Sequence, residues 1–350
     1  MADLERYTGL EPLDIYEDWA KLSPEKRRIR ILKAVNEREE AAVLSLCEAY
    51  LYKRSKSGVN VSQGTVRLYR RGVQDVLEAF GHENLLRPSS DAGTTYRNQL
   101  MRTRVPIRKG RQRFEQDYSE TKPLSPSTIG VKLAAARLLY DALEWAGATT
   151  AKPFTDVHAP PDKEEVQDKT PPWSDEAVET LLEAAEREGA GAIGVMVVLG
   201  AHAGLRIGEM TALCWQHVDW ARRRMTVHGK GGTRKAVRLT ARTLETLRSY
   251  HQVYSDDLRY KNRRAKDYVL PWTTNHARLK FEEFCQMQGV SDDYAASAVH
   301  GLRHYAGTRY YRQVRDLGRV AAHLRHSSIQ TTRRYAKLST DEIGEDIDDW

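Results

Sequence analysis

Four short segments in the second half of the chain carry cationic side chains and one phenol at spacings that suit chemistry on a phosphodiester bond. They are Gly204–Glu209, which includes Arg206; Gly229–Gly232, which includes Lys230; His300–Arg303; and Leu324–Tyr335, which includes His326. On a helix, residues three positions apart lie on one face, so His300 and Arg303 would point together. The four segments are therefore candidates for one shared site.

Breaking a phosphodiester bond makes three demands on a protein. The phosphorane-like transition state carries spread negative charge, and arginine suits it because the planar guanidinium meets two oxygens at once. A nucleophile must attack in line, and the leaving 5′-oxygen must receive a proton. The segments contain side chains for each role, and the phenol of Tyr335 is one candidate nucleophile.

These segments resemble the catalytic domain of the tyrosine recombinase (phage integrase) family. The family order is Arg, a hairpin Lys, His-x-x-Arg, His or Trp, and then Tyr. This order is met here by Arg206, Lys230, His300, Arg303, His326 and Tyr335, with the family's nine-residue step from His326 to Tyr335. The resemblance covers about Trp173 to Thr340. The chain departs from it at Arg325, where the family commonly has Gly, and at His217 and Gly301, where it often has Asp.

The resemblance also implies a role for each residue. Arg206 and Arg303 would clamp the phosphate, and His326 would donate a hydrogen bond to it. Lys230 would give a proton to the 5′-oxygen, and His300 would shuttle a proton or form a hydrogen bond. Tyr335 would form a 3′-phosphotyrosyl link. Because that link keeps the bond energy, no cofactor, ATP or metal is expected.

Ordinary structural roles are the alternatives. Tyr335 could be a packed helix tyrosine, with Ser327 or Ser328 capping a short helix that ends near it. Arg206 could pair with Glu209, which would also orient it for catalysis. Lys235 competes with Lys230 in the same hairpin, and the Gly-Lys-Gly context favours Lys230.

Two pairs of histidines allow a metal site as a rival interpretation. His300 with His304, and His323 with His326, have helical spacings that could bind zinc. No HExxH motif and no clustered cysteines accompany them. A catalytic or structural role is therefore favoured over a metal site.

The order of helix, turn and linker signals predicts two domains and a mainly α fold. We expect an N-terminal extension (1–35), a helical core-binding bundle that binds DNA (36–152), a proline-rich linker (153–172) and a mostly helical catalytic domain with a small β-hairpin (173–340). Residues 125–147 loosely resemble the family's core-binding domain. Together the two domains would form a clamp around duplex DNA.

Bulk properties agree with a cytoplasmic DNA-binding protein. The formal net charge is +7, which favours a polyanionic partner. The three cysteines form no CxxC pair, the acidic N-terminus is not a signal peptide, and the apolar run 190–201 is too short to span a bilayer. We therefore expect no membrane partner.

A basic stretch between residues 102 and 113 is the clearest candidate for DNA-phosphate contacts outside the catalytic segments. Its cations are Arg102, Arg104, Arg108, Lys109, Arg111 and Arg113, and Pro106 and Gly110 argue against a helix. A solvated loop is an equally good interpretation.

The C-terminal residues 341–350 combine acidic side chains with Ile343, Ile347 and Trp350 at helical spacing. A frayed acidic terminus is the alternative to the contact with a neighbouring protomer that the resemblance implies. An exposed apolar stripe is costly without a partner, which favours the protomer contact.

The resemblance implies a site-specific DNA recombinase, as in integration, excision or dimer resolution. It would act on double-stranded DNA as a homo-oligomer, a tetramer on two sites, with or without an accessory protein. Two alternatives are a type IB topoisomerase, which shares the chemistry but works as a monomer, and a non-catalytic DNA-binding regulator on the same fold. The apolar tail favours the recombinase over the topoisomerase, and the presence of all six residue types argues against the regulator.

Overall fold

The computed structural model describes residues 11–106, 121–162, 173–187, 191–229, 232–256, 267–290, 298–326 and 329–336. The chain divides into two compact units, Met1–Lys163 and Glu164–Trp350. Each unit has its own buried apolar core. The expected mainly α fold with a small sheet is confirmed.

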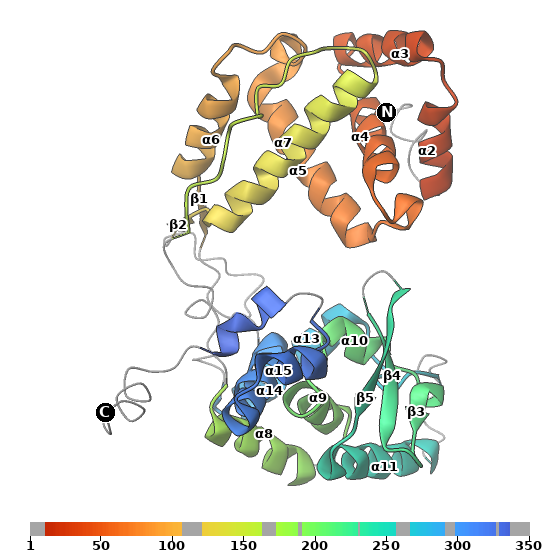
Figure 1. Cartoon of the computed structure of the whole chain (residues 1–350), viewed down its shortest axis with the longest axis vertical. Coiled ribbons are helices and arrows are strands. Elements are labelled where there is room, and N and C mark those ends of the chain that lie inside the picture. The colour runs from red at the N-terminus through yellow and green to blue at the C-terminus, as the bar shows by residue number, and fades with distance from the viewer. Residues whose placement is uncertain are drawn as a thin grey trace. The chain divides into compact units, whose positions relative to one another are not determined.

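The N-terminal unit is a helical bundle with one short hairpin. Its elements are α2 (Pro12–Ala20), α3 (Pro24–Asn36), α4 (Glu40–Arg54), α5 (Gln63–Asn84), α6 (Ala92–Arg102), the antiparallel strands β1 (Arg104–Pro106) and β2 (Thr121–Pro123), and α7 (Pro126–Trp145). Serine hydroxyls accept from backbone N–H groups at the starts of three of these helices, at Ser23, Ser62 and Ser125. α4 packs against α2, α3, α5 and α7 in the bundle (Figure 1).

The first helices belong to the same core as the rest of this bundle. Trp19 and Ile31 are fully buried, and the Trp19 indole Nε1 donates to Ser45 Oγ on α4 at 2.9 Å. The part of residues 1–35 that the structure describes therefore packs into the bundle rather than extending from it.

The C-terminal unit is built around the apolar helix α9 (Ala192–Ala201). The other helices are α8 (Asp175–Arg187), α10 (Ile207–Thr211), α11 (Ala241–Asp256), α13 (Thr274–Met287), α14 (Ala298–Val314) and α15 (Leu317–Leu324). α9 is buried from Gly194 to Ala201 and contacts α8, α11, α13 and α14 (Figure 1). No helix in the described part of the chain is long and apolar enough to cross a membrane.

A three-stranded antiparallel sheet completes this unit. β3 (Val218–Asp219) pairs with β4 (Arg224–His228), which pairs with β5 (Arg234–Arg238), with Met225 opposite Val237 and His228 opposite Arg234. The expected hairpin is therefore present. Lys230, in its turn, lies outside the described residues.

Candidate active site

Arg206 lies where the chain turns from α9 into the short helix α10. Gly204 adopts a left-handed backbone (φ +58°), which glycine accommodates without strain, and Arg206 then caps α10. The Arg206 backbone N–H donates to Glu209 Oε2 at 2.9 Å, and its Nη1 donates to Glu209 Oε1 at 3.0 Å. The expected pairing of Arg206 with Glu209 is confirmed, and the Arg206 side chain stays 46% exposed.

Arg303, in α14, is buried beneath this turn, with its side chain 1% exposed. Its Nη1 donates to the Gly204 carbonyl and its Nη2 to the Leu324 carbonyl at the end of α15. Nη1 also lies 4.0 Å from Glu209 Oε2. One guanidinium thus ties α14 to the Gly204 turn and to α15.

The pKa of Arg303 is lowered to about 10, first by burial and then by the charges of Arg206 and Arg325. The Glu209 carboxylate opposes this lowering. Tyr335 packs in one cluster with Leu324, whose carbonyl accepts from Arg303. Arg303 remains a cation at neutral pH. The structure thus brings Arg206, Arg303 and Tyr335 into one neighbourhood.

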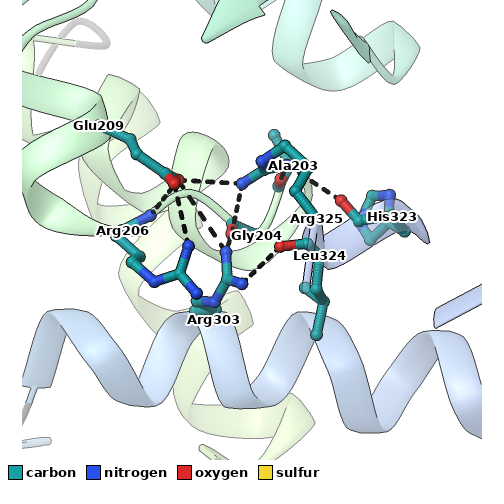
Figure 2. Close-up of polar contacts among 8 residues, drawn as sticks. All are labelled: Ala203, Gly204, Arg206, Glu209, Arg303, His323, Leu324 and Arg325. Carbon is teal, nitrogen blue, oxygen red and sulfur yellow. Dashed lines mark hydrogen bonds and ion pairs between the residues drawn. The ribbon is translucent and has the colours of Figure 1, made fainter. Parts of the chain in front are cut away.

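Glu209 is shared by three arginines (Figure 2). Arg325 Nη2 donates to Glu209 Oε2 at 3.0 Å, in addition to the two contacts from Arg206. Burial alone would raise the pKa of Glu209, but the Arg206 backbone bond and the surrounding guanidinium charges outweigh burial and lower it. The carboxylate is therefore ionised and orients cations from three separate elements, α10, α14 and α15.

Tyr335 ends a short 3₁₀ segment (Arg333–Tyr335) and is buried against Ala306, Val320 and Leu324. Its hydroxyl oxygen lies 3.2 Å from His304 Nδ1. His304 is buried and follows Arg303 directly in the sequence. The tyrosine is therefore both packed in the core and hydrogen-bonded beside the arginine cluster.

The two predicted site histidines contact Tyr335 and His304 with their rings. The His326 ring is stacked with the Tyr335 ring, with centroids 6.2 Å apart, and His326 Nδ1 lies 2.8 Å from Thr332 Oγ1. The exposed His300 contacts the His304 ring edge-on, with centroids 4.5 Å apart. His300 and Arg303 both lie on α14, His300 exposed and Arg303 buried, and their convergence on one site stays a prediction.

Sequence reasoning did not assign two residues of this cluster to the site. His304 was considered only as a metal ligand, and Arg325 only as a departure from the family pattern. Adjacency to Arg303 was the available signal for His304. The short helix expected before Tyr335 is replaced, in the described residues, by 3₁₀ segments at Ile329–Thr331 and Arg333–Tyr335, and Ser327 and Ser328 lie outside them.

The basic stretch is described only at its start. Arg102 is the last residue of α6 and is exposed. Arg104 begins β1, and its guanidinium donates to Thr121 across the hairpin. Arg108, Lys109, Arg111 and Arg113 lie outside the described residues, as does the tail 341–350. A role for these cations in DNA contact stays a prediction.

The residues of this site lie within a stretch of the chain that matches a known protein family. Residues 174–342 match the Phage integrase family. The tyrosine recombinase XerC of Neisseria gonorrhoeae is 26% identical over 308 residues, which covers 85% of this chain and 92% of that protein.

Two solved structures share the fold. A lambda integrase dimer bound to a COC′ core site matches with a TM-score of 0.61 at 13% identity, over 87% of this chain and 95% of that chain. The XerH site-specific recombinase in a pre-cleavage complex with its difH substrate matches with a TM-score of 0.59 at 15% identity, over 99% of this chain and 94% of that chain.

The chain therefore contains, at residues 174–342, a domain of the phage integrase family. It is a site-specific recombinase, an enzyme that cleaves and rejoins DNA strands.

Replacing Glu209 by glutamine should destabilise the C-terminal unit by about 2–4 kcal/mol, because the buried cation Arg325 loses its carboxylate partner. Glu179→Gln is the matched control, since its arginine partner Arg242 is a third exposed and such pairs contribute less than about 1 kcal/mol. Urea unfolding of both variants measures the difference. Equal losses in the two variants would contradict a special role for Glu209.

His202, at the end of α9, gives the C-terminal unit a pH-dependent stability. Its pKa is lowered to about 4, first by burial and then by the cations Arg309 and Arg242, while Glu179 opposes them. The folded protein therefore keeps this imidazole neutral at pH values where the unfolded chain, with a pKa near 6.5, protonates it. The contribution of His202 to the free energy of unfolding is fully present above pH 6.5. It is lost as the pH falls toward 4.

We expect the free energy of unfolding of this unit to fall by at most about 1.4 kcal/mol per pH unit from this group between pH 6.5 and 4.5. His202→Gln should flatten that slope, because glutamine keeps a polar group near Thr240 without titrating. Urea unfolding at pH 7.5, 6.0 and 5.0 gives the comparison. Parallel slopes for the two proteins would exclude His202 as the source.

Proposed function

We propose that Tyr335, Arg303 and Arg206 form the catalytic centre of this recombinase and act on a phosphate of double-stranded DNA. The observation that carries the proposal is that three segments far apart in sequence meet around Arg303. Glu209 joins Arg206 to Arg303, and Tyr335 packs in one cluster with Leu324, whose carbonyl accepts from Arg303. Fixed cations beside a hydroxyl nucleophile are the arrangement that phosphoryl transfer needs.

In the proposed reaction the Tyr335 oxygen attacks phosphorus as a base takes the phenol proton. A bond forms between the tyrosine oxygen and phosphorus, and the bond from phosphorus to the 5′-oxygen breaks. The 5′-oxygen takes a proton and departs as a hydroxyl, which leaves a 3′-phosphotyrosyl link. A 5′-hydroxyl from a partner strand then attacks the link, restores the phosphodiester and releases the tyrosine.

The other predicted residues complete this scheme as proposals. Lys230 would give the proton to the 5′-oxygen, His326 would donate to the phosphate, and His300 would move a proton or hydrogen-bond. Arg206 is exposed, whereas Arg303 and Tyr335 are buried, so a phosphate can reach all three only after a local rearrangement of the site.

Assembly and location are part of the same proposal. Both domains would contact DNA, residues 36–152 through the basic stretch that starts at Arg102 and residues 173–340 through the catalytic centre. In a tetramer on two DNA sites, the tail 341–350 would contact a neighbouring protomer. The lambda integrase and XerH structures contain DNA, which supports a double-stranded DNA partner. Integration, excision or dimer resolution in the cytoplasm are the settings that fit.

The test is covalent capture of DNA in EDTA. The substrate is a library of randomised duplexes with a nick close to the cleavage position, so that the short fragment carrying the 5′-hydroxyl diffuses away after cleavage. The library is incubated with the protein, and the products are separated on a denaturing gel. We expect a shifted protein–DNA band, with the DNA mapped to Tyr335 by mass spectrometry after proteolysis. Attachment at another residue, or no band with duplexes that the protein binds, would contradict the proposal.

A further inference from the structure

Arg325 has a backbone conformation that glycine would adopt with less strain. It follows α15 as a left-handed C-cap, with φ 59° and ψ 37°. Helix ends of this kind favour glycine, because a side chain crowds the backbone at positive φ. The turn by itself therefore does not account for arginine at this position.

Within the described residues, the hydrogen bonds of the Arg325 side chain go to groups in and beside the candidate active site. The side chain is 5% exposed. Nη1 donates to the carbonyls of Ala203 at 3.2 Å and His323 at 2.9 Å, and Nη2 donates to the Gly204 carbonyl at 2.9 Å and to Glu209 Oε2 at 3.0 Å. The guanidinium thus ties the end of α15 to the turn that precedes Arg206.

Two of these four acceptors also hold Arg303. The Gly204 carbonyl accepts from both guanidinium groups, and Glu209 Oε2 lies near both (Figure 2). Glu209 also fixes Arg206 through its other oxygen. Arg325 therefore acts on both proposed phosphate ligands through shared partners, and its burial keeps it from touching DNA in this state.

Arg325 also changes the charge of the cluster. Three guanidinium groups and one carboxylate leave a charge of +2, where Arg206, Arg303 and Glu209 alone would leave +1. The extra positive charge stabilises negative charge on a phosphate bound beside the cluster, and this stabilisation is greatest in the transition state, where that charge increases.

We infer that Arg325 is a positioning residue of the phosphate site, which fixes the Gly204 carbonyl and the Glu209 carboxylate and so orients Arg303 and Arg206 toward the scissile phosphate. This inference rests on the proposed function. It predicts that loss of Arg325 slows cleavage much more than it weakens DNA binding.

The variants are Arg325→Gly, which suits the left-handed backbone, and Arg325→Lys, which keeps the charge but has no planar fork. Arg315→Gly is the matched control, because Arg315 is an exposed arginine with φ 48° in the same unit. Thermal unfolding of each variant shows whether it folds.

The first measurement is the single-turnover cleavage rate on a DNA sequence that covalent capture has identified. Two substrates are compared, one with a phosphate and one with a methylphosphonate at the scissile position. We expect Arg325→Gly to slow phosphate cleavage by about 10- to 100-fold, with DNA affinity within about twofold of wild type. The loss should be smaller on methylphosphonate, which lacks the charged oxygen that the arginines meet. Equal losses on both substrates, or wild-type rates for Arg325→Gly or Arg325→Lys, would overturn the inference.

The second measurement needs no DNA, so it separates failure of this inference from failure of the proposed function. With arginine-selective ¹⁵N labelling, we expect the Nε–H signal of Arg303 to exchange faster with solvent in Arg325→Gly and to be unchanged in Arg315→Gly. An unchanged Arg303 signal in Arg325→Gly would overturn the inference even if wild type captures DNA. A changed signal without capture by wild type would support positioning and reject the proposed function.

Discussion

Replacing Tyr335 by phenylalanine should abolish covalent capture of DNA and leave folding and DNA affinity nearly intact. Phenylalanine keeps the ring contacts with Ala306, Val320 and Leu324 and removes only the hydroxyl. No other atom of the ring can form an ester with phosphorus, so the rate should fall below detection rather than to a fraction. Loss of the hydrogen bond between Tyr335 and His304 Nδ1 should cost about 1 kcal/mol of stability.

Tyr305→Phe is the control for this prediction. Tyr305 is also buried, lies on α14, and its hydroxyl accepts from Arg309 Nη1 at 2.7 Å. We expect this variant to lose comparable stability but to capture DNA at the wild-type rate. Capture by Tyr335→Phe on the same gel would identify another nucleophile and refute our site.

Replacing Arg303 by lysine should slow cleavage by about 100- to 1,000-fold at saturating DNA. Lysine keeps the charge but presents a point donor, so it cannot hold the Gly204 and Leu324 carbonyls and a phosphate in one plane. The effect should appear in the single-turnover rate of covalent complex formation, because the planar fork matters most when charge develops on the phosphate.

Arg309→Lys separates this effect from a general loss of charge on α14. Arg309 is an exposed arginine six residues along the same helix. We expect it to cleave within about twofold of wild type. If Arg303→Lys lowers the unfolding temperature but cleaves at the wild-type rate when folded, Arg303 has a structural role only.

The sequence determined the helices and the order of the chemical groups, because both depend on short-range features. The serine caps at Ser23, Ser62 and Ser125 form between residues three apart, and the hairpin registers follow from a local turn. The pairing of Arg206 with Glu209 was also predictable, since it spans less than one helical turn. The family resemblance of residues 174–342 rests on the same local spacings.

Only the tertiary structure decided which acceptors these groups meet. Arg325 bonds to a carbonyl 121 residues away in the sequence, and Arg303 to one 99 residues away. Such contacts depend on how closely the end of α15 approaches the Gly204 turn, and no residue spacing encodes that distance. For the same reason, the burial of Tyr335 against His304 and the packing of Trp19 into the N-terminal core could not be predicted from local pattern. Hydrogen bonds within a turn are specified by neighbouring residues, whereas a shared buried carboxylate is specified by the packing of whole helices.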